Sequence, residues 1–176
     1  MDNADLSRRD LLKLGAAATV AASLPIDALA QPAPTFFTRD ELALVDELSE
    51  MIIPTDEHSP GAKAAKVAAY IDSQLGEAFD EKDKTTWRGG LKLVDQLSRD
   101  ANNGKPFLQA TPEQRLAVLT GMAANEQKPE KPEEHFFVEL KARVVHAYYT
   151  SEIGIKQEME YKGNSYLTEF VGTDVS

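Results

Sequence analysis

Phe37-Thr38-Arg39-Asp40-Glu41-Leu42 is the stretch of sequence that decides the fold, because it specifies the start of a helix. Thr38 can accept a hydrogen bond from the Glu41 backbone while the Glu41 side chain reaches back, and Phe37 can pack on Leu42. Beyond this capping box, apolar residues recur at helical spacing: Leu42, Val45, Leu48 and Ile52. The pattern predicts an amphipathic helix that begins at the capping box and ends before Pro54.

Two further helices are predicted in the middle of the chain. The first extends from about Ala62 to Leu75, where several alanines permit close helix approach. A charged connector is expected over 79–86. Trp87 then opens a third helical face, and Asn102-Asn103-Gly104 provides a left-handed stop at its end.

The second half of the chain predicts two more helices and a tail. Thr111-Pro112-Glu113-Gln114 is a second capping box that introduces a short helix. A solvated linker is expected over 127–134, followed by a helix that ends at about Tyr149. No alternating strand pattern precedes the tail over 150–176. The fold class is therefore all-α, an irregular bundle of four to six helices with an extended C-terminal tail.

The N-terminal residues have the pattern of a twin-arginine export signal. Ser7-Arg8-Arg9-Asp10-Leu11-Leu12-Lys13 precedes an apolar run over 14–24, and Ala28-Leu29-Ala30 offers a cleavage site after Ala30. The alternative is a membrane anchor, but the apolar run is about half the roughly 20 residues that span a bilayer. Arg8 and Arg9 are thus predicted export residues. The expected organisation is a signal peptide over 1–30, a linker over 31–37 and a helical domain over 38–176.

Composition excludes several classes of function. The signal contains three of the 19 basic and four of the 29 acidic side chains, so the remaining 146 residues carry a net charge of −9. An acidic surface disfavours binding to nucleic acid and to anionic lipid headgroups. The absence of cysteine excludes disulfides, thiolate nucleophiles, iron–sulfur ligation and covalent haem attachment. If electrons pass through an assembly that contains this chain, the chain does not carry them.

One cluster offers candidate metal ligands, namely Asp56, Glu57 and His58 in a turn-rich loop. Three consecutive side chains point in different directions, so a solvated turn is the simpler interpretation. His135 and His146 fall about three helical turns apart, roughly 16 Å, and cannot share one ion. No strained serine elbow or glycine-rich phosphate cradle is present. We therefore assign no catalytic, cofactor-binding or metal-ligating residue. A small metalloenzyme that uses Asp56 and His58, or a stand-alone periplasmic helical binding protein, remains the alternative function.

A folded-export signal on a chain without a cofactor motif suggests that the signal serves a partner. Twin-arginine routes carry folded proteins, commonly because a cofactor is inserted before export. The tail aromatics Tyr161, Tyr166 and Phe170 allow two interpretations, as does Tyr148-Tyr149: they pack back on the bundle, or they contact that partner.

The sequence resembles the gluconate 2-dehydrogenase subunit 3 family, the small subunits of membrane-associated flavin sugar dehydrogenases. The resemblance extends over most of the chain. Besides the twin-arginine start, the matching residues are Phe36-Phe37-Thr38 with Glu41, Ile52-Ile53-Pro54-Thr55-Asp56, Ser59-Pro60-Gly61-Ala62, Tyr70-Ile71-Asp72 with Leu75, Tyr148-Tyr149-Thr150-Ser151-Glu152-Ile153-Gly154 and Tyr161-Lys162-Gly163.

The resemblance implies a noncatalytic subunit that supplies the export signal and stabilises a large FAD-containing dehydrogenase subunit of the glucose–methanol–choline type. The FAD lies in that partner, and a multihaem cytochrome c subunit often completes the complex. The expected location is periplasmic, with membrane association through the complex. The regions between Leu75 and Thr111 and after Tyr161 are shorter than in the gluconate and fructose enzyme subunits. The resemblance therefore does not fix the substrate, and a partner that oxidises a glycoside or another sugar is equally admissible. The partner interface is expected at Pro54, Asp56, His58, Pro60, Tyr148, Tyr149, Tyr161, Tyr166 and Phe170.

Overall fold

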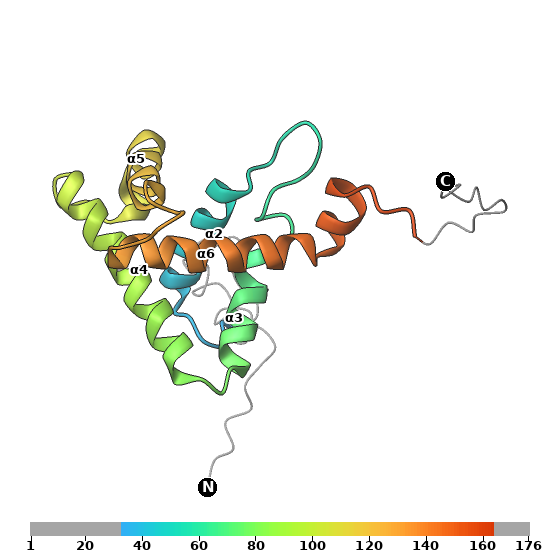
Figure 1. Ribbon diagram of the computed structural model, residues 1–176, viewed down its shortest axis with the longest axis horizontal. Helices are drawn as coiled ribbons and strands as arrows, with labels where there is room; N and C mark the ends of the chain where they lie inside the picture. The colour runs from blue at the N-terminus through green and yellow to red at the C-terminus, as the bar shows by residue number, and fades with distance from the viewer. Residues whose placement is uncertain (1–32, 164–176) are drawn as a thin grey trace, which may run out of the picture. The chain divides into compact units, whose positions relative to one another are not determined.

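Five α-helices make up most of the chain that the computed structural model describes, residues 33–163 (Figure 1). In chain order these are α2 (Arg39–Ile52), α3 (Val67–Glu77), α4 (Glu81–Ala101), α5 (Pro112–Ala123) and α6 (Pro132–Tyr149). A 3₁₀ turn, η2 (Phe107–Gln109), precedes α5, and a π-helical turn, η3 (Gly154–Glu158), follows α6. No strand occurs within 33–163, so the predicted all-α class is confirmed.

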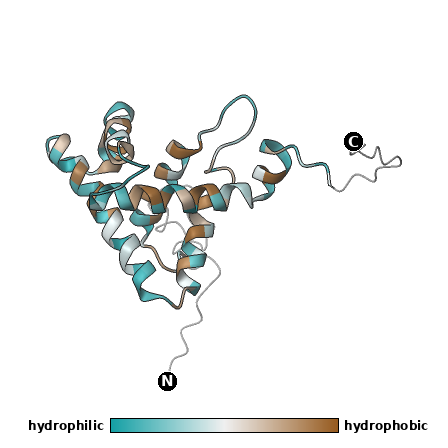
Figure 2. Ribbon diagram, in the orientation of Figure 1, coloured by the Kyte–Doolittle hydropathy of each residue, from teal (hydrophilic) through white to brown (hydrophobic). Residues whose placement is uncertain are grey.

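The long helix α6 organises the bundle. It contacts α2, α3, α4 and α5, and Figure 1 shows it running across the first three. Hydrophobic and hydrophilic residues alternate along each helix (Figure 2), as expected of helices that bury one side and expose the other. The unit that contains these helices begins at Pro34.

Both predicted capping boxes are present. The Glu41 backbone N–H donates to Thr38 Oγ1 at 3.2 Å, and the Thr38 N–H donates to the Glu41 carboxylate at 2.9 Å. Thr111 and Gln114 make the same exchange at the start of α5. The predicted left-handed stop is also observed, with Gly104 at φ 82° just beyond α4. Local sequence signals therefore set these helix ends as expected.

Two predicted connectors and one helix start were wrong. Residues 62–66 form turns, and α3 begins only at Val67, because Lys66 has a left-handed φ of 56°. The predicted charged connector over 79–86 is helical from Glu81, since the Asp80 side chain caps the Lys82 N–H at 2.8 Å. The predicted linker over 127–134 is too long, because α6 begins at Pro132. In each case a cap or a backbone turn outweighed composition.

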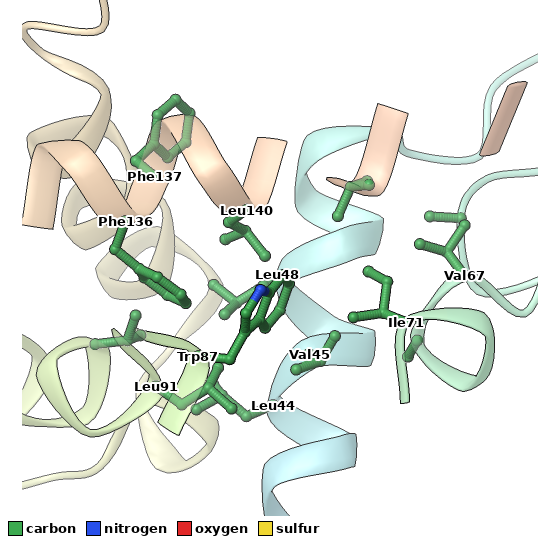
Figure 3. Close-up of a cluster of buried hydrophobic side chains, with 14 of the residues drawn as sticks. Leu44, Val45, Leu48, Val67, Ile71, Trp87, Leu91, Phe136, Phe137 and Leu140 are labelled. Atoms are coloured by element: carbon green, nitrogen blue, oxygen red, sulfur yellow. The ribbon is translucent and has the colours of Figure 1, made fainter. Parts of the chain in front are cut away.

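The core is centred on Trp87, which is fully buried (Figure 3). Its ring lies 6.0 Å from Phe37 and 5.7 Å, edge to face, from Phe136, between centroids. The close approach of α6 to α4 requires a glycine, because a Cβ at Gly90 would overlap the Phe136 ring. The indole N–H of Trp87 has no hydrogen-bond partner among the described residues.

The start of the domain is tied to α3 by the carboxylate of Asp72. Its Oδ2 accepts hydrogen bonds from the Thr35 N–H at 2.6 Å and the Thr35 hydroxyl at 2.8 Å. Its Oδ1 accepts from the Phe36 and Phe37 N–H groups at 3.0 and 2.7 Å. The predicted linker over 31–37 thus ends in three residues that are docked on the bundle, and Phe37 is buried.

Candidate functional site

The loop between α2 and α3 contains four of the predicted interface residues, and it is organised around the carboxylate of Glu50. Glu50 Oε1 accepts from the Thr55 N–H and hydroxyl, each at 3.0 Å. Its Oε2 accepts from the Lys63 N–H at 2.8 Å. Figure 1 shows the loop projecting from the helices that it joins. One side chain at the end of α2 therefore fixes both sides of the loop.

The tip of the loop is an Asp56-centred turn. Asp56 Oδ1 accepts from the His58 N–H at 2.8 Å and from the Ser59 N–H at 2.9 Å. These hydrogen bonds, that from Ser59 first, hold the pKa of Asp56 below its ordinary value. Its own N–H donates to the Ser59 carbonyl at 3.1 Å. The carboxylate thus shapes the turn.

Tyr148 at the end of α6 locks this loop to the bundle. Its hydroxyl donates to the Pro60 carbonyl at 2.7 Å and lies 2.5 Å from Ser59 Oγ. Because the single tyrosine proton goes to Pro60, the Ser59 hydroxyl donates to the tyrosine oxygen. Tyr148 is only 1% exposed. The structure thus corrects the assignment of Tyr148 to the partner interface, because this side chain packs back on the bundle, the first of its two predicted interpretations, and supports the loop.

The turn after α6 closes against the same loop. Ser151 Oγ donates to the Tyr148 carbonyl at 2.6 Å and accepts from the Gly154 N–H at 3.1 Å. A Cβ at Gly154 would overlap the Tyr148 carbonyl, so this turn requires glycine. The predicted extended tail therefore begins with a π-helical turn, η3, stabilised by this serine.

η3 contacts the loop through Glu158. His58 Nε2 donates to the Glu158 carbonyl at 3.2 Å, and the Tyr149 hydroxyl donates to the Glu158 carboxylate at 3.4 Å. The hydrogen bond to Glu158, together with the carboxylates of Glu158, Glu160 and Asp56, raises the pKa of His58, and desolvation opposes the shift. We call residues 53–61, Tyr149 and 151–161 together the loop–turn surface.

The loop–turn surface combines exposed apolar side chains with carboxylates. Tyr149 is 38% exposed, Met159 49% and Tyr161 56%. The exposed carboxylates are Asp56, Glu57, Glu152 and Glu160, and Glu158 is half-buried. Of the predicted interface residues, Pro54, Asp56, His58, Pro60, Tyr149 and Tyr161 all belong to it. Tyr166 and Phe170 lie outside the described residues.

Sequence reasoning missed the residues that build the surface from beneath. Glu50 reads as one more acid on a solvated helix face, and only the fold shows that it turns toward Thr55 and Lys63. Ser151 and Gly154, by contrast, follow a helix end and carry a turn signature that the sequence already displays.

The described part of the chain offers no metal centre. Within 33–163, no three histidine, aspartate or glutamate side chains gather closely enough to hold an ion. His146 lies beside the Tyr70 ring, with centroids 6.4 Å apart. The same residues include no helix that is long and apolar enough to cross a membrane.

Comparison with known families gives the assignment. The family model described as Gluconate 2-dehydrogenase subunit 3 matches residues 39–166, which cover all five helices and the loop–turn surface. The chain belongs to this family. A second model, the TAT (twin-arginine translocation) pathway signal sequence, matches residues 5–25 and includes Arg8 and Arg9, so the predicted export signal is confirmed. Neither a comparison with curated proteins nor one with solved structures found a match.

Proposed function

We propose that this gluconate 2-dehydrogenase subunit 3 family protein is the noncatalytic small subunit of a periplasmic, FAD-dependent sugar or glycoside dehydrogenase. It supplies the export signal for the complex and stabilises the large flavoprotein subunit, which is of the glucose–methanol–choline type. A multihaem cytochrome c subunit then accepts the electrons and holds the complex at the membrane. Oxidation of the substrate takes place in the large subunit.

The observation that carries this proposal is the pairing of a twin-arginine signal with a subunit-type domain. The domain contains no cysteine and no glycine-rich dinucleotide fingerprint. A route for folded cargo is useful to a partner that must acquire FAD before export. One signal can serve both chains if they associate in the cytoplasm, which requires a preformed docking surface.

The loop–turn surface has the properties of such a docking surface. Hydrogen bonds to the Glu50 carboxylate and from the Tyr148 hydroxyl fix its backbone before binding, so little conformational entropy is lost on association. Tyr149 and Met159 offer the exposed aromatic and thioether groups that are enriched at interfaces. The carboxylates around them favour a partner surface with basic residues.

The test is co-expression of the large subunit with and without this chain. We expect FAD-loaded large subunit in the periplasm only when this chain is present. Export of an active, stable large subunit in the absence of this chain would contradict the proposal.

Point variants test the docking surface itself. Met159→Ser should lower the amount of large subunit that co-purifies with this chain. Leu116→Ser is the matched control, because Leu116 is similarly exposed but lies on α5, away from the loop–turn surface. Equal recovery with both variants would remove the loop–turn surface from the interface.

A further inference from the structure

The chain enters the folded domain at a fixed point. Ala33 is exposed, and residues 35–37, which follow it closely, are already held on the bundle. We call the four hydrogen bonds from these residues to the Asp72 carboxylate the Asp72 clamp. Because Asp72 belongs to α3, the clamp ties the start of the domain to that helix.

α4 secures the same residues. Arg88 Nη2 donates to the Phe36 carbonyl at 2.8 Å, and the Arg88 guanidinium lies 4.5 Å from the centre of the Phe36 ring, in the arrangement of a cation–π contact. Phe37 is buried against Trp87. Contacts with two helices therefore determine where the chain leaves the bundle toward the export signal.

This point and the loop–turn surface lie at opposite ends of α2. Residues 35–37 precede the Thr38 cap of α2, and the loop over 53–61 follows its last residue. The 14 residues of α2 span about 21 Å at 1.5 Å per residue. In Figure 1 the start of the domain, in blue, and the loop lie on opposite sides of α6. The two features are thus separated by the length of a helix.

The predicted cleavage site is close to the clamp along the chain. Thr35 is the fifth residue after Ala30, so even a fully extended backbone places their Cα atoms at most about 18 Å apart. This limit is shorter than α2. The covalent chain therefore keeps the Ala30–Gln31 bond near the clamp.

We infer that the Asp72 clamp presents the export signal at the end of α2 opposite the loop–turn surface, so that the signal stays accessible while the large subunit is bound. The large subunit covers the loop–turn surface and leaves the start of the domain open. Removal of the signal hydrolyses the Ala30–Gln31 peptide bond with one water, and it then takes place on the assembled complex without release of the large subunit. This inference rests on the proposed function, because the partner that it names is the large subunit.

Cysteine labelling tests the inference, because the chain contains no cysteine of its own. Three exposed positions of the tagged full-length chain receive single cysteines. Ala33→Cys lies beside the clamp, Glu57→Cys lies on the loop, and Ala117→Cys on α5 is the control. Each variant is purified with and without the large subunit from cells that lack twin-arginine translocation, and its rate of reaction with a maleimide is measured.

The expected result is protection at one end only. The large subunit should slow labelling of Glu57→Cys at least about tenfold, because a covered thiol reacts only when the interface opens. Labelling of Ala33→Cys and of Ala117→Cys should not change.

A second measurement tests the clamp. Energy transfer from Trp87, the only tryptophan, to a dye on Ala33→Cys is recorded in the full-length chain alone. It should fall when Asp72→Asn is added and stay unchanged with the control Asp46→Asn. Equal transfer in both would show that the clamp does not place the start of the domain.

The labelling outcomes separate this inference from the proposed function. If wild-type chain recovers no large subunit, the proposed function fails. If the complex forms and Ala33→Cys is protected as strongly as Glu57→Cys, the inference is wrong while the proposed function stands. A complex in which Glu57→Cys is not protected would also overturn the inference, because the large subunit would then bind elsewhere.

Discussion

The substitution Asp72→Asn tests how the folded domain begins. In the wild type, two carboxylate oxygens accept four hydrogen bonds from residues 35–37, two at each oxygen. Asparagine has the same shape but only one acceptor oxygen, and its NH₂ group faces two donors. The variant therefore loses two hydrogen bonds to a charged group and leaves donors without acceptors.

The expected cost follows from these contacts. A hydrogen bond to a charged group contributes roughly 1.5–3 kcal/mol, so two lost bonds give an upper value of about 6 kcal/mol. Undocking of residues 35–37 limits the decrease in the free energy of unfolding, because the freed N–H groups then form hydrogen bonds with water. The only further loss is the burial of Phe37. We expect a decrease of about 3 kcal/mol in the free energy of unfolding, which corresponds to a shift of roughly 1.5 M in the urea midpoint.

The contribution of Asp72 to stability depends on pH with a definite sign. Burial pushes the pKa of Asp72 upward, but the hydrogen bonds from Phe37, Thr35 and Phe36 outweigh it and leave the pKa below its ordinary value. A carboxyl with a lowered pKa contributes stability that is present above its unfolded pKa of about 3.9. That contribution is lost as the pH falls through the folded pKa. The difference in the free energy of unfolding between wild type and Asp72→Asn should therefore be at its maximum near about pH 7 and shrink below about pH 4.

Trp87 provides the assay, since it is the only tryptophan and packs against Phe37. Urea unfolding of the cleaved chain is followed by its fluorescence. Asp46→Asn is the control, because burial and the carboxylates of Glu50 and Glu47 raise the pKa of Asp46 despite Lys63, so removal of its charge should cost nothing. If Asp72→Asn has the stability of Asp46→Asn near about pH 7, the Asp72 clamp does not hold the N-terminal residues as described.

Two further predictions test close packing and the lock on the loop. Gly90→Ala should destabilise the domain by at least about 1 kcal/mol, since its Cβ would overlap a core phenyl ring, whereas Gly89→Ala should stabilise α4 by up to about 1 kcal/mol because nothing lies near its Cβ. Thermal unfolding compares the two, and equal shifts would show that α4 and α6 are not in close contact at Gly90. Tyr148→Phe removes the donor to Pro60 and should cost about 1–3 kcal/mol and expose the loop to protease. Tyr149→Phe, which loses only a long, exposed hydrogen bond, should leave the rate of cleavage unchanged, and equal cleavage of the two variants would exclude the lock.

Much of the fold could be predicted from the sequence because local signals determine it. Capping boxes at Thr38 and Thr111 and the stop at Gly104 specify helix ends through contacts within a few residues. The start of α4 was missed for a physical reason. The charged residues after Asp80 look like a solvated connector, but their acidic members suit the first turn of a helix and their polar side chains need not be buried.

The candidate site was predicted in its exposed residues and missed in its supports. Motif residues of the loop and of the helix end after it were recognised separately, but their contact joins positions about 90 residues apart, as in the pair Ser59 and Tyr148. Long-range pairing of this kind leaves no periodic signal in a single sequence.

Replacement of Arg8 and Arg9 by lysine, in cells that also make the large subunit, tests the central claim most directly. The two arginines lie in the matched twin-arginine signal. Both chains should then accumulate in the cytoplasm, with the large subunit absent from the periplasmic fraction. Periplasmic, active large subunit beside a cytoplasmic Lys–Lys variant would show that the two chains are exported independently.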